Sequence, residues 1–282
     1  MNFSLGLIGL YVVLVGIASF AEKPVSGKLD AYRLTAALKV GTLAVAVPAL
    51  LIAGQWRHAS IPAVGAGLGI GLISGIGSAF YCFAVKRTPL DVAATFSNAY
   101  VIVTAVLGIT ILGEPLTVLR VLGLILTIAG IVALSVRGGG TGPHGLGKTV
   151  SLLGIYVVVV GVATFLEKPA LHYLAPLQLN VLVAAGMVAA GFGALLIFDR
   201  SVGWGLPWVE AGGIGALIGL GGVFYYLGLV HLPVSVAATL SDTYILLTVG
   251  LGVIFLQERL GWFRIAGIAA TVAGIVLVSI GP

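Results

Sequence analysis

Charged residues are scarce in this chain of 282 residues: only 8% are Asp, Glu, Lys or Arg. Soluble domains carry roughly 25% charged residues, and a soluble chain with 60% hydrophobic residues lacks the polar groups to cover its surface. This scarcity excludes a soluble enzyme, a nucleic-acid binder and a disordered protein. The single cysteine, Cys82, excludes a disulfide framework and a cysteine-rich metal site.

Long apolar runs occupy most of the chain. A membrane-spanning helix needs about 20 predominantly apolar residues, and ten segments meet this requirement. We therefore predict an all-α polytopic membrane protein of the cell's inner (plasma) membrane. The first segment has neither a basic leader nor a cleavage pattern, so we do not expect a cleaved signal peptide. The ten segments are Leu5–Ala21, Leu34–Ala53, Ile61–Val85, Val92–Leu112, Val118–Val136, Val150–Leu166, Leu177–Phe198, Pro207–Val230, Val234–Leu256 and Trp262–Ile280.

An internal duplication runs through nearly the whole chain. The segment Tyr11–Pro24 recurs as Tyr156–Pro169, and Ser97–Tyr100 recurs as Ser241–Tyr244. Each copy contains five spans, an odd number, so the second copy must enter the bilayer from the opposite side. The sequence thus predicts two inverted five-helix repeats, an architecture that places substrates near the middle of the membrane between the repeats.

The repeats are predicted to be residues 1–137 and 150–282, joined by a glycine-rich linker over residues 138–149. The segment Gly142–Thr149 has the spacing of a phosphate-binding loop. No strand is predicted before it and a membrane span follows it. We interpret the segment as a flexible linker.

The segments around the fourth span of each repeat resemble a known group of transporters. They are Ala94–Tyr100, Ile111–Thr117 and Leu122–Ile131, with second copies at Ala238–Tyr244, Phe255–Leu260 and Ala266–Ile275. The chain resembles the drug/metabolite transporter superfamily, in its ten-helix EamA-domain branch, over essentially its whole length. The resemblance implies a cofactor-free secondary transporter, often an exporter of amino acids or other small metabolites. The glutamate in the first helix of each repeat is similar to that of the small multidrug resistance transporters, where it exchanges protons for cationic substrates.

Basic residues in the short loops predict the orientation of the chain. Ten Lys and Arg residues fall in loops on one side and three, Arg57, Arg120 and Lys168, on the other. Because basic loops stay in the cytoplasm, this bias places both termini outside. The family resemblance implies the opposite, with both termini in the cytoplasm.

Two glutamates near the ends of the first and sixth spans are candidates for proton coupling or gating. Glu22 and Glu167 each precede a Lys-Pro pair, and a proline in a helix frees a backbone carbonyl one turn earlier. A carboxylate beside a free carbonyl favours a proton or a cation. The alternative is that Glu-Lys-Pro merely ends each helix at the interface, with Lys23 and Lys168 neutralising the glutamates.

Asp242 is predicted to lie well inside the ninth span, where an ionisable group indicates a functional site. Its repeat mate is Asn98, so one charge breaks the pseudo-symmetry. We expect Asp242 to bind substrate or protons, or to form a structural ion pair with Lys39 of the second span.

Other polar side chains are expected to line a cavity bounded by the first, second, fourth, sixth, seventh and ninth spans. Ser97 and Tyr100 share one helical face, as do Ser241 and Tyr244. Tyrosine hydroxyls and rings suit the recognition of ammonium groups, and hydrogen bonding between helices is the alternative role. The predicted substrate-binding residues are Asp242, Asn98, Tyr100, Tyr244, Ser97, Ser241, Tyr81, Tyr225 and Lys39, with Tyr226 and Asn180 as further polar lining.

Small residues at four-residue spacing occur at Gly67, Gly71 and Gly75 and again at Gly215 and Gly219. In membranes such ridges allow helices to approach closely, so we predict packing surfaces there.

We therefore predict a secondary-active transporter of small organic metabolites, such as amino acids or organic cations, that works by alternating access with proton coupling. The sequence contains no nucleophile–base pair and no metal-ligand cluster, so neither an enzyme nor a cofactor is expected. The expected partners are a small-molecule substrate, the lipid bilayer and protons, without nucleic acid, and the expected state is a monomer or weak dimer. The alternative is a subunit of a lipid or lipid-linked-sugar flippase.

Overall fold

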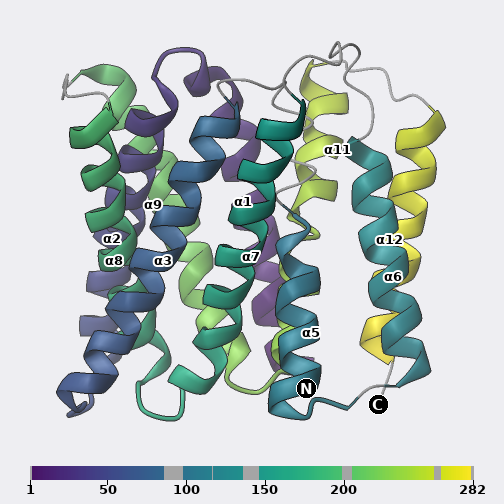
Figure 1. Cartoon of the computed structure of the whole chain (residues 1–282), viewed down its shortest axis with the longest axis horizontal. Helices are drawn as coiled ribbons and strands as arrows, with labels where there is room; N and C mark the ends of the chain where they lie inside the picture. Colours follow the sequence, from purple (N-terminus) through teal and green to yellow (C-terminus); the bar gives the residue numbers. More distant parts are fainter. Residues whose placement is uncertain are drawn as a thin grey trace.

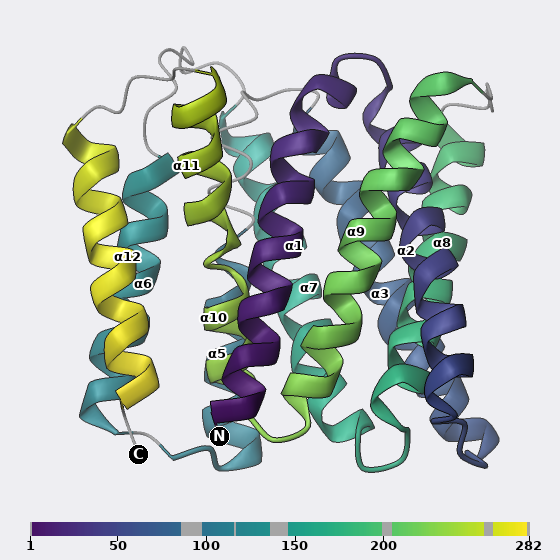
Figure 2. The same ribbon diagram turned by 180° about the vertical axis from the view of Figure 1, so that it is seen from behind.

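The computed structural model describes residues 2–85, 98–115, 117–135, 146–198, 205–256 and 262–280. Within these ranges all regular elements are helices that run nearly parallel to one another, and α1 begins at the end of the bundle where α12 finishes (Figures 1 and 2). The helices are α1 (Asn2–Ser26), α2 (Ala31–Ala53), α3 (Ile61–Val85), α5 (Tyr100–Leu112), α6 (Val118–Ser135), α7 (Leu146–Ala170), α8 (Pro176–Phe198), α9 (Leu206–Leu229), α10 (Val234–Ser241), α11 (Tyr244–Leu256) and α12 (Trp262–Ile280).

These helices form ten segments, because α10 and α11 together make one interrupted segment. Within the described residues, seven of the segments are long and apolar enough to cross a membrane, and α5, α6 and α12 contain shorter apolar stretches. The described part of the fourth span is α5 with Asn98 and Ala99 before it, and residues 92–97 of that span lie outside the described residues. The predicted class, an all-α polytopic membrane protein, is confirmed. Two predicted boundaries were wrong: α1 continues beyond Ala21 to Ser26 and α7 continues beyond Leu166 to Ala170, each with the proline of Glu-Lys-Pro inside the helix. Glu-Lys-Pro therefore does not end either helix at the glutamate.

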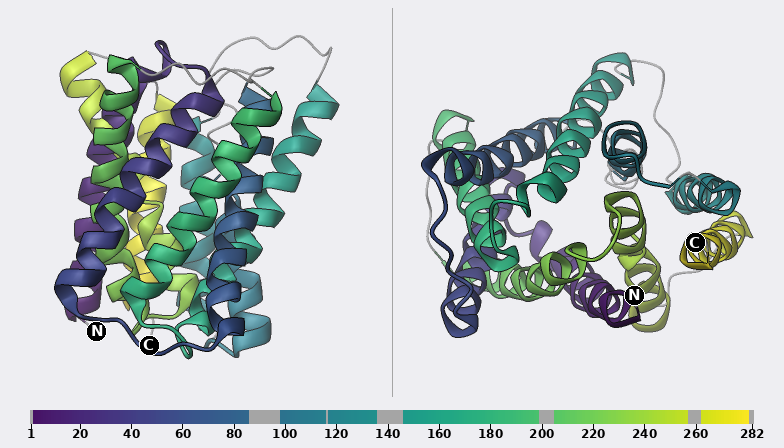
Figure 3. Two further views of the ribbon diagram at one scale, coloured as in Figure 1. Left: turned by 90° about the vertical axis from the view of Figure 1, so that its left-hand side faces the viewer. Right: turned by 90° about the horizontal axis from the view of Figure 1, so that it is seen from below.

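The two repeats interlock instead of forming separate bundles. Helix α1 packs against α9 and α11, and its repeat mate α7 packs against α3 and α5. Likewise α2 packs against α9, and α8 packs against α3. Helices α2 and α8 pack against each other, as do α6 and α12, which stand side by side at one edge (Figure 3). Each of these contacts therefore either recurs between the two corresponding helices of the other repeat or joins two corresponding helices. This is the pattern expected when a pseudo-twofold axis relates inverted repeats.

Glycines set the closest approaches between the repeats. A Cβ added to Gly215 of α9 would lie 2.1 Å from the carbonyl oxygen of Leu38 in α2. In the mate contact, a Cβ on Gly71 of α3 would lie 2.1 Å from the carbonyl oxygen of Val183 in α8. The two ridges predicted from the sequence are therefore packing surfaces between repeats, because only glycine leaves room for the facing backbone.

The ninth span is interrupted halfway along. Residues Asp242 and Thr243 separate α10 from α11, and the backbone tightens there to bonds between residues three apart, from Thr243 to Leu240 and from Ile245 to Asp242. The corresponding position of the first repeat also shows a turn: α5 begins only at Tyr100, after a turn at Asn98 and Ala99. The sequence predicted continuous helices here. Discontinuous helices in transporters commonly border the substrate site.

The glycine contacts predict a difference between two neighbouring positions on α9. Gly215→Ala should lower the stability by about 1–3 kcal/mol, because the added methyl group overpacks the contact with α2. Gly213→Ala is the matched control, since a Cβ at Gly213 meets nothing within 4 Å. Thermal unfolding of both variants in detergent measures the effect. Equal unfolding midpoints for the two variants would show that the close contact does not limit stability.

Candidate functional site

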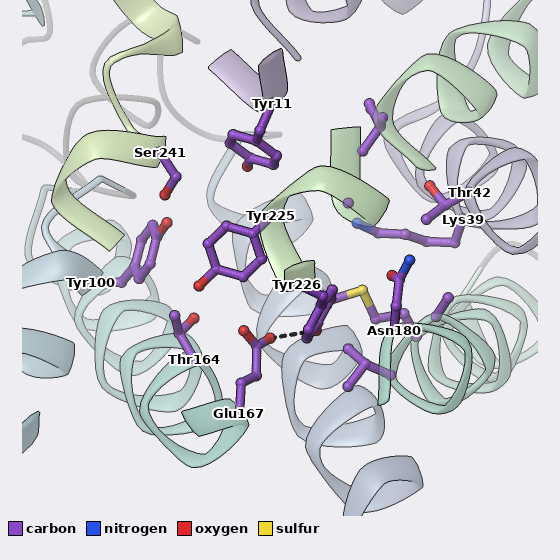
Figure 4. A pocket seen from close by; sticks show the side chains of 15 residues that line it. Tyr11, Lys39, Thr42, Tyr100, Thr164, Glu167, Asn180, Tyr225, Tyr226 and Ser241 are labelled. Atoms are coloured by element: carbon purple, nitrogen blue, oxygen red, sulfur yellow. Dashed lines mark hydrogen bonds between the residues drawn. The ribbon is translucent and has the colours of Figure 1, made fainter. Parts of the chain in front are cut away.

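A cavity of about 200 Å³ lies between the repeats, among the helices that carry most of the predicted polar residues (Figure 4). The predicted set of spans around the cavity left out the eighth span, α9, although Tyr225 and Tyr226 of that span were among the predicted polar residues. The lining residues are Tyr11, Lys39, Thr42, Tyr100, Thr164, Glu167, Asn180, Val183, Ala184, Met187, Ile218, Gly222, Tyr225, Tyr226 and Ser241.

Glu167 is the carboxylate that faces this cavity. It is only 6% exposed, and its Oε1 accepts a hydrogen bond of 2.9 Å from the Tyr226 hydroxyl. The Tyr225 hydroxyl also points toward it (Figure 4). Its second oxygen, Oε2, is buried without a hydrogen-bond partner in the described structure. Apart from the nearby Tyr225 hydroxyl, this acceptor of a buried carboxylate is left for a ligand or a proton.

The lysine that follows Glu167 turns away from it. Lys168 Nζ donates to the carbonyl oxygens of Leu229 at 2.7 Å and Val230 at 2.9 Å, at the end of α9. The alternative interpretation, in which Lys168 neutralises Glu167, therefore does not describe this geometry. Glu167 remains a buried acid that tyrosine hydroxyls stabilise.

Asp242 is the second buried carboxylate, at the interruption of the ninth span. It is 3% exposed, and its Oδ1 accepts a hydrogen bond of 2.8 Å from the hydroxyl of Tyr100, a residue of the cavity wall. Its Oδ2 is buried without a hydrogen-bond partner among the described residues. One alternative drawn from the sequence was an ion pair between Asp242 and Lys39. In the structure, the hydrogen bond to this carboxylate comes from Tyr100.

Tyrosine pairs repeat across the pseudo-twofold axis. The rings of Tyr11 and Tyr225 lie 5.4 Å apart at 46°, and those of the mates Tyr156 and Tyr81 lie 5.5 Å apart at 44°. The first pair lines the cavity and the second does not belong to its lining. Tyr11 also lies near enough to Asp242 and Glu167 to interact with both electrostatically.

The two repeats differ in their charges. Glu22, the mate of Glu167, is partly exposed and interacts electrostatically with Lys39. The positions of α8 that correspond to Lys39 are Val183 and Ala184, which are apolar. The mate of Asp242, Asn98, is buried and neutral. Among the described residues, the two carboxylates that carry an unpartnered buried oxygen both come from the second repeat.

Most predicted site residues gather in or beside the cavity. Tyr100, Ser241, Tyr225, Lys39 and Glu167 line it, together with Tyr226 and Asn180. Asp242 contacts the wall through Tyr100. Asn98, Tyr244, Tyr81 and Glu22 lie outside this lining, and Ser97 lies outside the described residues.

The sequence prediction missed three polar lining residues, Tyr11, Thr42 and Thr164. Tyr11 opens the duplicated segment, so its repetition at Tyr156 was an available signal. Thr42 and Thr164 have no polar pattern around them that would single them out. Among the described residues, no three His, Cys, Asp or Glu side chains form a cluster able to hold a metal ion.

Comparison with known proteins agrees with this architecture. The sequence model of the EamA-like transporter family matches twice, at residues 3–136 and 147–280. A solved crystal structure is similar over 99% of this chain and 97% of its own chain, with a TM-score of 0.83 and 19% sequence identity, which shows a shared fold. The search of curated proteins gave no match. Because the two matches cover nearly the whole chain, it is a multi-pass membrane transporter of the drug/metabolite transporter superfamily and belongs to the EamA-like transporter family.

Proposed function

We propose that this protein is a secondary-active transporter that moves small organic solutes bearing an amino group through the central cavity. The observation that carries the proposal is the pair of buried carboxylates, Glu167 and Asp242, each with one oxygen that lacks a hydrogen-bond partner in the described structure. An unpaired charge inside a membrane is costly, so such groups are neutralised by a proton or paired with a cation. An ammonium group supplies both the charge and the missing donors.

The aromatic wall supports the same class of substrate. Tyr11, Tyr100, Tyr225 and Tyr226 surround the acidic part of the cavity (Figure 4). Tyrosine rings attract cations through their negative faces, and their hydroxyl groups already stabilise both carboxylates. The volume of about 200 Å³ suits a metabolite smaller than a typical drug-sized ligand.

The opposite wall carries groups that suit an anion or another acceptor. Lys39 lines the cavity, and Asn180 Nδ2 is buried without a hydrogen-bond partner in the described structure. Both lie across Tyr226 from Glu167 (Figure 4). A zwitterion such as an amino acid would engage both walls, whereas a simple organic cation would engage only the acidic one. The arrangement favours the amino acid.

Inverted repeats and interrupted helices support alternating access as the transport mechanism. Glu22 and Glu167 occupy equivalent positions of inverted helices, so they lie toward opposite faces of the membrane. We propose that they take up and release protons on opposite sides, which would couple a proton gradient to substrate movement. Export from the cell is the direction that the family resemblance favours.

The substrate site is tested with Glu167→Gln and Asp242→Asn in proteoliposomes. Each substitution keeps the side-chain shape and removes the charge that would attract the ammonium group, so uptake of a radiolabelled amino acid should fall roughly tenfold or more. Glu210→Gln is the matched control, because Glu210 is a surface carboxylate paired with Lys28 at 2.7 Å. A panel of amino acids and organic cations in a thermal-shift screen selects the labelled substrate. Unchanged uptake by both cavity variants would refute the proposal.

Proton coupling is tested with an imposed pH gradient. Glu22→Gln and Glu167→Gln, alone and together, should abolish gradient-driven accumulation, because a glutamine side chain neither binds nor releases a proton near neutral pH. Passive exchange of labelled for unlabelled substrate should persist in Glu22→Gln, whose side chain lies outside the cavity lining. Full accumulation by the double variant would show that these residues do not couple protons.

A further inference from the structure

A turn between α9 and α10 is held by two charged side chains that the proposed substrate site does not use. Glu114, just after α5, accepts hydrogen bonds from the backbone N–H of Val234, from the N–H of Ser235 at 3.1 Å and from the Ser235 hydroxyl. Lys168 of α7 donates to the carbonyls of Leu229 and Val230. The name turn lock is used below for these two side chains together with the backbone groups that they bind.

The charges of the turn lock match the helix ends that they bind. Lys168 binds the carbonyl end of α9, and Glu114 binds the amide end of α10. A cation at a helix C-terminus and an anion at an N-terminus are each favourable, because they satisfy unpaired backbone groups and oppose the helix dipole. Lys168 and Glu114 also interact with each other electrostatically. The turn is therefore fixed from both sides.

The local sequence places Glu114 for this contact. Gly113 adopts a left-handed conformation with φ of 65°, which ends α5 and redirects the chain. Within α5, Gly108 leaves room for the carboxylate, since a Cβ there would lie 2.9 Å from Glu114 Oε2. Larger side chains at these two positions would displace Glu114 from α10.

The turn lock lies at one end of the cavity. Glu167, one residue before Lys168, binds Tyr226 of α9, so α7 contacts α9 through two successive side chains. Closer to the end of the bundle where α1 begins lie four apolar side chains, each at most 2% exposed. These are Leu174, Leu229, Leu232 and Val234. We call this end the terminal face.

We propose that Glu114 and Lys168 are positioning residues that keep the cavity closed toward the terminal face, and that the turn lock must open once in each transport cycle. This inference rests on the proposed alternating access. Helix α9 carries Tyr225 and Tyr226, and α10 carries Ser241 and leads to Asp242. Release of the turn would therefore move the walls of the cavity as well as its closure.

Thiol accessibility tests the turn lock without any substrate. In a Cys82→Ser background, Thr164→Cys places a reporter in the cavity wall, and a membrane-impermeant maleimide is added to right-side-out or inside-out vesicles. Glu114→Gln and Lys168→Met should each raise the labelling rate from the terminal face roughly tenfold, because they weaken charge-assisted hydrogen bonds. Lys168→Arg should restore slow labelling. Arg57→Gln removes an exposed charge on the same face and is the control.

Unchanged labelling in folded, monodisperse Glu114→Gln and Lys168→Met would overturn the proposal. Cross-linking gives an independent test if these variants fold poorly. Glu114→Cys with Ser235→Cys, joined by a short bifunctional thiol reagent, should stop transport and recover it when the link is cleaved. Continued transport by the cross-linked protein would also overturn the proposal. The labelling readout requires no transported substrate, so failure of the turn lock is distinguishable from failure of the proposed substrate.

Discussion

Close contact between the two repeats is the constraint on which the rest of the structure depends. In a bilayer the apolar faces of helices gain little by leaving lipid, so association depends on tight packing and on polar contacts between helices. Gly215 of α9 against α2 and Gly71 of α3 against α8 provide this packing. Thr42 adds a polar contact, since its hydroxyl lies 3.2 Å from the Gly215 carbonyl. The cavity lies among these interlocked helices, so its lining combines residues of both repeats.

Departures from symmetry define the chemistry of the cavity. The backbone repeats itself closely, as the two tyrosine pairs show. The charges do not: Glu167 faces tyrosines while Glu22 has Lys39 as its neighbour, and Asp242 replaces Asn98. Because buried charges without a counter-ion are costly, they persist where a ligand or proton completes them. The acidic wall thus belongs to one repeat, although the scaffold belongs to both.

Polar contacts at the terminal face connect the cavity with its closure. Glu167 and Lys168 are adjacent in sequence but point to different partners, one to Tyr226 and the other to the carbonyl end of α9. Glu114 reaches α10 from the other repeat. A shift of α9 relative to α7 would disturb both the acidic wall and the held turn. This arrangement provides a physical link between the Glu167 side chain and the turn that Glu114 and Lys168 hold.

The sequence alone determined the membrane class, the inverted duplication, the glycine ridges and most polar residues of the cavity, because apolar length, repeat offset and residue spacing are local properties. It did not determine that α1 continues through Pro24 or that the ninth span is interrupted at Asp242, where neither glycine nor proline occurs. Partner choice was decided only by the tertiary structure: Asp242 binds Tyr100, and Lys168 binds the end of α9 instead of Glu167. A long side chain reaches several neighbours, and helix packing alone decides which of them lies within hydrogen-bond distance.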